Sequence, residues 1–167
     1  VNSLLANAGT PQVWSLGIID PNNRDQLNAA ASMVYAKSMA YHLTGNAEYA
    51  AVVRQKILEI SVTNTCPNDY SGGNGCILTL SRHIPGYVAA ADLIADYPGW
   101  TAADKQTFQI WLRDKVYRFT DWSSDARSTN WGSVGTMATL YIADYFAGSN
   151  MTLIDRDGKA MSPGQAF

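Results

Sequence analysis

Hydrophobic residues recur at steps of three and four between residues 24 and 148, which is the spacing of one face of an α-helix. The pattern predicts five helices, which cover residues 24–43, 47–61, 78–96, 101–119 and 130–148. No alternating run of useful length for a strand occurs before residue 150. Short connections make consecutive helices antiparallel neighbours. The sequence therefore predicts an all-α fold.

Local signals mark several helix ends. Gly45 is placed to end the first helix, and Asn46 can cap the second. Thr101 and Asp104 resemble a capping box at the start of the fourth helix. Pro85 falls inside the third helix and should kink it or reset its start.

Three segments lack a helical period. Residues 1–23 are interrupted by glycine and proline, residues 120–129 are polar, and residues 149–167 show no clear pattern. A length of 167 residues corresponds to about one domain. We therefore expect one helical domain over residues 1–167, with a loop at 120–129 and an irregular tail at 149–167.

The five helices fall into two chemical kinds. Helices 47–61 and 101–119 carry charges on one face, which is typical of surface helices. Helices 78–96 and 130–148 are apolar or small nearly all round, which is typical of buried helices, and helix 24–43 is intermediate. This alternation predicts antiparallel helix pairs in two layers, an inner and an outer one. The alternative is a plain five-helix bundle.

Composition and charge exclude several classes of protein. Hydrophobic residues make up 47% of the chain and charged residues 16%, which argues against intrinsic disorder. The net charge of −2 includes no basic excess in either half, so we expect no nucleic acid partner. The longest weakly charged apolar stretch, Val134–Ala147, is too short to span a bilayer, so we expect no membrane partner.

Two cysteines flank a loop rich in glycine and asparagine. Cys66 and Cys76 lie within the predicted loop 62–77, and this arrangement predicts a disulfide. Closing so short a loop stabilises the fold by about 2–3 kcal/mol. A disulfide favours a secreted or periplasmic protein. The alternative is a pair of free thiols in a cytosolic protein.

The predicted helix directions bring polar side chains to one end of the array. If consecutive helices are antiparallel, the first, third and fifth point the same way and their N-termini gather. The polar, cationic and aromatic residues there are Asn23, Arg24, Arg82, His83, Arg127, Asn130 and Trp131. Helix N-termini carry partial positive charge and free N–H groups, so this end should favour anions such as carboxylates.

Much of the chain resembles a known family. The runs SRHIPGYVAAADLIADYPGW, QIWLRDKVY and STNWGSVGTMATLYIADYF, together with the earlier AYHLTGNAEYAAVVRQKILEI, resemble polysaccharide lyases of the alginate lyase type. The resemblance covers about residues 24–148 and implies an α/α toroid of inner and outer helices. Five helices would form a partial toroid, either a fragment of a larger lyase domain or a module completed by another chain.

The resemblance also implies a reaction, β-elimination on a uronate polymer. Asn130 matches the asparagine that binds the uronate carboxylate. His83 or a tyrosine, such as Tyr87 or Tyr141, would then remove the C5 proton. Lyases of this type commonly have histidine directly after the asparagine, whereas Trp131 stands here and would stack on a sugar.

The remaining polar residues would bind the polymer. Arg82, Arg127, Asn23 and Arg24 would contact acidic sugars, so the expected partner is an acidic polysaccharide such as alginate. No phosphate-binding glycine motif, Cys or His metal cluster or nucleophile elbow occurs, and we expect no cofactor and no metal. His42 lies near the other end of its helix.

Each candidate also has a structural interpretation. Capping its helix could be the whole role of Asn130, and His83 could be a hydrogen-bonded histidine in a kinked helix. Arg82 could pair with Asp92 or Asp125. Arg127 could be a solvated loop charge, and Trp131 a core residue.

Two other functions remain open. The chain could be a non-catalytic carbohydrate-binding or scaffold module with a lyase-like fold. It could also be a glycoside hydrolase on the same architecture, since such enzymes need two placed carboxylates and Asp121 and Asp125 flank the site.

Overall fold

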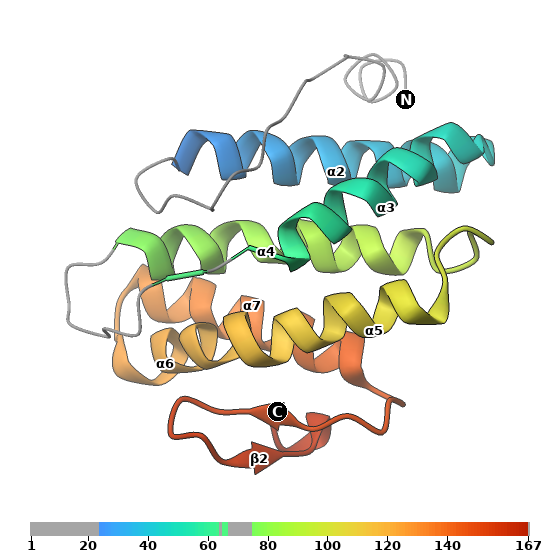
Figure 1. Ribbon diagram of the computed structural model, residues 1–167. Helices are drawn as coiled ribbons and strands as arrows, with labels where there is room; N and C mark the ends of the chain where they lie inside the picture. Colours follow the sequence, from blue (N-terminus) through green and yellow to red (C-terminus); the bar gives the residue numbers. More distant parts are fainter. Residues whose placement is uncertain (1–23, 64, 67–74, 167) are drawn as a thin grey trace.

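The computed structural model describes residues 24–63, 65–66 and 75–166, and its secondary structure is mostly helical (Figure 1). The all-α prediction is confirmed. The elements are α2 (Arg24–Thr44), α3 (Ala47–Ser61), α4 (Gly75–Leu93), α5 (Ala102–Trp111), the π-helical η1 (Leu112–Tyr117), α6 (Arg118–Ala126), α7 (Asn130–Phe146), β1 (Leu153–Ile154), β2 (Ala160–Met161) and the 3-10 helix η2 (Pro163–Gln165).

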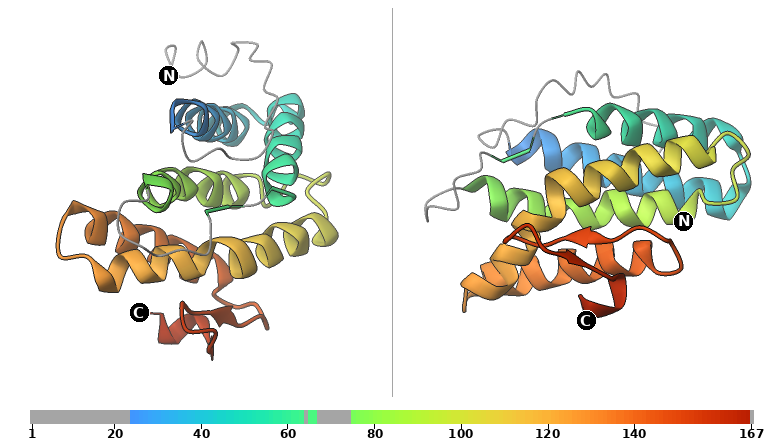
Figure 2. Two further views of the ribbon diagram at one scale, coloured as in Figure 1. Left: turned by 60° about the vertical axis from the view of Figure 1, so that its left-hand side comes forward. Right: turned by 60° about the horizontal axis from the view of Figure 1, so that its bottom comes forward.

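The helices lie in two layers. Helices α2, α4 and α7 lie side by side and run in the same direction, with α4 packed between the other two (Figure 1). Helix α3 and the α5–η1–α6 run form the second layer and point in the opposite direction to α2, α4 and α7 (Figure 2). The N-terminal ends of α2, α4 and α7 therefore lie at one end of the array, on the left in Figure 1.

The predicted capping residues act as expected. Gly45 adopts a φ of 69° directly after α2, which a residue with a Cβ rarely adopts. The Asn46 side chain accepts a hydrogen bond from the Glu48 N–H at 3.0 Å and caps α3. Thr101 and Asp104 form the reciprocal capping box of α5. These local signals fix where the helices begin and end.

The predicted loop at residues 120–129 is wrong over most of its length. The chain passes from α5 through η1 into α6, which continues to Ala126. Helix α6 buries Phe119, Thr120 and Ser123, and the Thr120 hydroxyl donates to the Tyr117 carbonyl at 2.9 Å. Because two of these three buried side chains are small and polar, the helix face does not register as a hydrophobic period.

Two other boundaries differ from the prediction. Helix α4 begins at Gly75 and continues through Pro85, which is buried inside it and does not restart the helix. In the tail, β1 and β2 pair antiparallel, with Leu153 opposite Met161. Leu153 is fully buried, and it anchors this short hairpin to the core.

Helix α7 is less buried than its sequence predicts. Its inner stripe packs against α4 and α6 and consists of Gly132, Gly135, Ala138, Thr139, Ile142, Ala143 and Phe146. On the opposite side Met137, Leu140 and Tyr141 are 39%, 37% and 45% exposed. By contrast, α4 is buried on nearly every side because α2 and α7 flank it. One apolar side of α7 is therefore not covered by any of the described residues.

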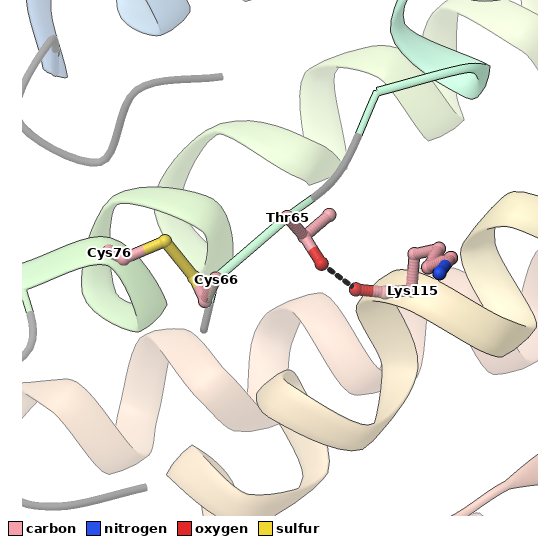
Figure 3. Close-up of a disulfide and its surroundings, with 4 residues drawn as sticks. All are labelled: Thr65, Cys66, Cys76 and Lys115. Carbon is pink, nitrogen blue, oxygen red and sulfur yellow. Dashed lines mark hydrogen bonds between the residues drawn. A yellow bond between two sulfur atoms is a disulfide. The ribbon is translucent and has the colours of Figure 1, made fainter. Parts of the chain in front are cut away.

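The predicted disulfide forms between Cys66 and Cys76, with the two Cα atoms 5.6 Å apart (Figure 3). It joins the segment after α3 to the first turn of α4, and both cysteines are buried. The same segment is held on η1 and α5, because the Thr65 hydroxyl donates to the Lys115 carbonyl and the Trp111 indole donates to the Thr63 carbonyl at 3.0 Å. The disulfide thus ties two layers together.

Replacing both Cys66 and Cys76 with alanine should lower the free energy of unfolding by about 2–3 kcal/mol, because the bridge restricts the unfolded chain. Equilibrium denaturation in urea measures the effect. Reducing agent should destabilise the parent protein to a similar extent and leave the variant unchanged. An unchanged unfolding midpoint in the variant would contradict a stabilising role for the bridge.

A bidentate ion pair connects α3 to α5. The Arg54 guanidinium donates to both Asp104 carboxylate oxygens, at 2.8 and 3.0 Å. Asp104 also accepts the Thr101 N–H and hydroxyl, at 3.0 and 2.8 Å, and is itself buried. The Arg54 hydrogen bonds, followed by those from Thr101, lower the pKa of Asp104 to about 2 against a burial cost that acts the other way.

The Asp104 pKa shift predicts an acid-sensitive contact. Because the folded-state pKa lies below the ordinary value of 3.8, the stabilisation is full above about pH 4 and is lost as pH falls towards 2. Since the Arg54 side chain is 38% exposed, we expect a contribution of about 1–2 kcal/mol. Urea denaturation of Asp104→Asn at pH 7 and at pH 2.5 measures it, and the deficit should shrink at the lower pH. If Asp104→Asn loses the same free energy of unfolding at both pH values, the loss comes from packing and not from the ionised carboxylate.

Candidate functional site

Candidate residues lie at the end of the array where α2, α4 and α7 begin. Arg24 is the first residue of α2, and Asn130 is the first residue of α7. Arg82 and His83 lie about two turns into α4 and are half-buried. Asn23 lies outside the described residues. Because α2, α4 and α7 run in the same direction, their first turns lie at the same end of the array (Figure 1).

Arg127 is held between two indole rings. Its guanidinium carbon lies 5.0 Å from the centroid of Trp122 on α6 and 5.3 Å from the centroid of Trp131 on α7. Both distances are typical of cation–π contacts. Its Nε is buried without a hydrogen-bond partner, and no carboxylate among the described residues pairs with it. Arg127 is therefore not a freely solvated loop charge, and none of the described carboxylates forms an ion pair with it.

Asn130 directly precedes Trp131 in the chain and is not the cap of its helix. The cap is Thr129, whose hydroxyl accepts the Trp131 N–H at 3.4 Å. The Asn130 side chain is exposed and makes no hydrogen bond within the described part of the chain. Trp131 is half-buried, so it is neither a core residue nor a free surface ring. The Asn130 amide, three residues after Arg127 in the chain, is thus available to a ligand.

The turn that carries these residues is unusually tight. A Cβ on Gly132 would lie 1.9 Å from the Arg127 carbonyl oxygen, and one on Gly135 would lie 2.6 Å from the Ser124 nitrogen. Hydrogen bonds close the same junction, since the Ser123 hydroxyl donates to the Trp131 carbonyl at 3.0 Å. The two glycines therefore let α6 and α7 approach closely enough to fix Arg127 between the rings.

His83 lies in a cationic neighbourhood. Burial is the main cause that lowers its pKa below 6.5, and the charges of Arg82 and Arg24 lower the pKa further. The imidazole is therefore neutral at pH 7, as a base must be. None of the described residues hydrogen-bonds it, so the interpretation of His83 as a hydrogen-bonded histidine finds no support here.

Arg82 has no ion-pair partner within the described ranges. The alternative of pairing with Asp125 is contradicted, because Asp125 binds Arg156 of the C-terminal hairpin at 3.2 Å. Arg24 and Arg82 lie close enough to His83 for their charges to lower its pKa, so two cations lie near this imidazole.

A comparison with protein families bears on this geometry. The family model described as alginate lyase matches residues 16–152. The chain belongs to the alginate lyase family. Comparisons with curated proteins and with solved structures gave no match. The resemblance of the sequence to this family is thereby confirmed over most of the chain.

Within this alginate lyase family member, two of the tyrosine base candidates are poorly placed. Tyr87 is fully buried, and burial strongly raises its pKa, so it cannot ionise near neutral pH. Tyr141 lies about 16 Å farther along α7 than Asn130, at 1.5 Å per residue. His42 is in the last turn of α2, at the opposite end. Among these candidates, His83 alone lies near the helix starts.

The two carboxylates considered for a hydrolase have partners in the tail of this family member. The Arg156 N–H donates to Asp121 at 3.2 Å, and the Arg156 guanidinium pairs with Asp125. Burial raises the pKa of Asp121. Both carboxylates thus hold the C-terminal hairpin against α6. In the described ranges no three His, Cys, Asp or Glu side chains gather as a metal site, and no helix is long and apolar enough to cross a membrane.

Sequence reasoning missed Trp122 and the role of Gly132. Trp122 fell in the predicted loop, so its position on a helix face next to Arg127 could not be anticipated. The signal that could have found it is the spacing of two tryptophans on either side of one arginine within ten residues. Gly132 belongs to the Asn-Trp-Gly start of α7, which the sequence marks only as a family resemblance.

Proposed function

We propose that this alginate lyase family member cleaves a uronate-containing polysaccharide by β-elimination at the starts of α2, α4 and α7. The observation that carries the proposal is Arg127, a cation within cation–π distance of two indoles and without a carboxylate partner among the described residues, three residues before the exposed Asn130. A guanidinium without a carboxylate partner is suited to bind a ligand carboxylate. Family membership supports lyase chemistry over other reactions of anions.

Carboxylate binding makes the C5 proton removable. Arg127 neutralises the uronate carboxylate, and the Asn130 amide donates a hydrogen bond to the oxygen on which charge develops when C5 loses its proton. The tight α6–α7 turn fixes the backbone that carries both groups before substrate arrives. Pre-positioned donors stabilise the enolate-like intermediate without having to reorganise.

His83 is the proposed base. Its neutral imidazole takes the C5 proton, the C5–H electron pair forms the C4=C5 double bond, and the C4–O bond breaks. The leaving oxygen receives a proton, which the imidazolium can return. Arg24 and Arg82 then bind acidic groups of neighbouring sugars, Trp131 stacks on a sugar ring, and Asn23 precedes α2 as a further contact.

The proposed function also includes a larger architecture, the complete α/α toroid. The two described layers would form part of an α/α toroid, and other helices of the same or another chain would close it. The disulfide is consistent with a secreted or periplasmic enzyme.

Incubation of the folded protein with alginate, hyaluronan, pectate and chondroitin tests the function. At least one polymer should yield products with a C4=C5 double bond, followed by ultraviolet absorbance. Reducing ends without that chromophore would indicate a hydrolase instead. No unsaturated product from any uronate polymer, with the fold verified by circular dichroism, would refute catalysis.

The second candidate is a carbohydrate-binding module without activity. The observation that favours it is Trp131 in the place where related lyases commonly have histidine. Under this alternative the protein binds a uronate polymer in titration calorimetry but never forms unsaturated product, so binding and turnover measured together separate the two functions.

The pH profile should report on His83. Because burial and two arginines lower its pKa, activity should be retained below pH 6.5 and fall only when the imidazole is protonated at lower pH. Replacing Arg82 with glutamine removes a positive charge, so the His83 pKa should rise and the acid limb of kcat should move to higher pH. NMR titration of the imidazole gives the same pKa without substrate. Lys159→Gln, in the tail, is the matched control. If the acid limb of kcat stays at the same pH in Arg82→Gln, His83 is not the base.

A further inference from the structure

A pocket of about 500 Å³ opens near the C-terminal ends of the same helices. It lies over α4, with Tyr35 of α2 on one side and Tyr141 of α7 on the other, and the start of α5 contributes Lys105. This end of the array is opposite the starts of α4 and α7 (Figure 1). The pocket is within the size range of small-molecule sites in proteins. It shares none of its lining residues with the proposed lyase site.

The charges around this pocket are mainly negative. Asp92 of α4 and Asp144 of α7 line it, both are exposed, and neither forms an ion pair with a described residue. The last carbonyl groups of α4 and α7 add partial negative charge. The one lysine of the lining, Lys105, donates to the Ala95 carbonyl at 3.3 Å and is held at the end of α4.

Aromatic rings form the walls. Tyr35 of α2 and Tyr141 of α7 line the pocket and are 43% and 45% exposed, so a ligand can reach their rings. Tyr145 closes the inner side and packs edge-on against Phe108, with the ring centroids 5.7 Å apart. Ring faces attract cations and also pack against the apolar faces of sugars. The floor consists of small side chains, including Ala89 and Ala91, and leaves room between the rings.

We propose that this pocket binds a protonated amine carried on a compact scaffold, such as an amino sugar or a short polyamine. The ammonium group contacts Asp92 and Asp144, and the scaffold lies between Tyr35 and Tyr141. A uronate is repelled here by the same carboxylates that attract the amine. The site therefore differs in ligand charge from the arginine-bearing end and stands independently of the proposed lyase activity.

Titration calorimetry and saturation-transfer NMR with four probes test the proposal. Glucosamine and putrescine represent the two sources of the amine, and glucose and glucuronate are the neutral and anionic comparisons. At least one amine should bind with a Kd on the order of 1 mM or lower, and glucose should bind at least about tenfold more weakly. Glucuronate should not bind. Added salt should weaken amine binding because the contacts are exposed. Preference for glucosamine over putrescine would identify a sugar scaffold, and the reverse a polyamine.

The double substitution Asp92→Asn and Asp144→Asn should weaken amine binding at least about tenfold. Both side chains are exposed, so the variant should fold, and Tyr141→Ala provides a second, uncharged test of the same pocket. Asp25→Asn removes a charge at the opposite end of α2 and should leave binding unchanged. The proposal is overturned if neither amine binds, if glucose binds as tightly as the amines, or if the double variant binds like the parent.

Discussion

Replacing Asn130 with alanine should lower kcat on the cleaved polysaccharide by about 10²–10³-fold, the usual effect of removing one donor that stabilises developing negative charge. The fold should be almost unaffected, because Thr129 and not Asn130 caps α7 and the Asn130 side chain is exposed. We expect the free energy of unfolding to stay within about 0.5 kcal/mol of the parent. Steady-state kinetics and denaturation of the same preparation measure both quantities.

A matched control for this variant is Asn150→Ala, another exposed asparagine that lies beyond α7. It should leave both kcat and stability unchanged. Binding of the polymer separates the two candidate functions, because Asn130→Ala should lose turnover with little change in affinity if the residue acts mainly on the intermediate. Full activity in Asn130→Ala would remove this residue from the reaction.

Replacing Gly132 with alanine should destabilise the protein by about 2–3 kcal/mol. The new Cβ would lie 1.9 Å from the Arg127 carbonyl oxygen, and a backbone atom cannot move aside by changing rotamer. Alanine gains about 1 kcal/mol in helix propensity over glycine, which is less than the cost of forcing the two segments apart. Urea denaturation measures the net loss.

The same substitution should also reduce activity beyond what the loss of stability explains. Moving the backbone at Arg127 should separate its guanidinium from Trp131, so the proposed carboxylate-binding geometry should be lost even in molecules that remain folded. Tryptophan fluorescence should change as well. Gly75→Ala is the control, because nothing lies within 4 Å of a Cβ built there. Parent-like stability in Gly132→Ala would show that α6 and α7 can separate without cost.

The sequence predicted the helices best where the hydrophobic period was reinforced by local signals. Gly45 and Asn46 separate α2 from α3, and Thr101 starts α5, because capping depends on neighbours in the chain. Helix direction followed from the short connections. The gathering of Arg24 and Asn130 at one end could therefore be predicted from the order and spacing of the helices alone.

What the sequence did not reveal depends on contacts between distant segments. Helix α6 was missed because its buried side includes Thr120 and Ser123, whose polarity hides the period. The exposure of Tyr141 depends on which helices cover α7, and periodicity reports only that a face is apolar. The position of Arg127 between two rings depends on the close approach of α6 and α7. Two glycines allow this approach, but glycines in a sequence do not by themselves predict it.

The helix dipoles of α2, α4 and α7 add, whereas those of α3 and the α5–η1–α6 run point the opposite way and offset part of the sum, which leaves a smaller net dipole along the helices. Arg24 and Arg127 lie next to the starts of α2 and α7, where Asp25 and Asp125 also lie, whereas Asp92 and Asp144 lie in the last turns of α4 and α7. A polyanion repels the chain's net charge of −2 only weakly but exerts a torque on this dipole. Under the proposed function, this torque favours encounters in which the arginine-bearing end faces the polymer. Encounters become more productive at low ionic strength, and salt removes that advantage.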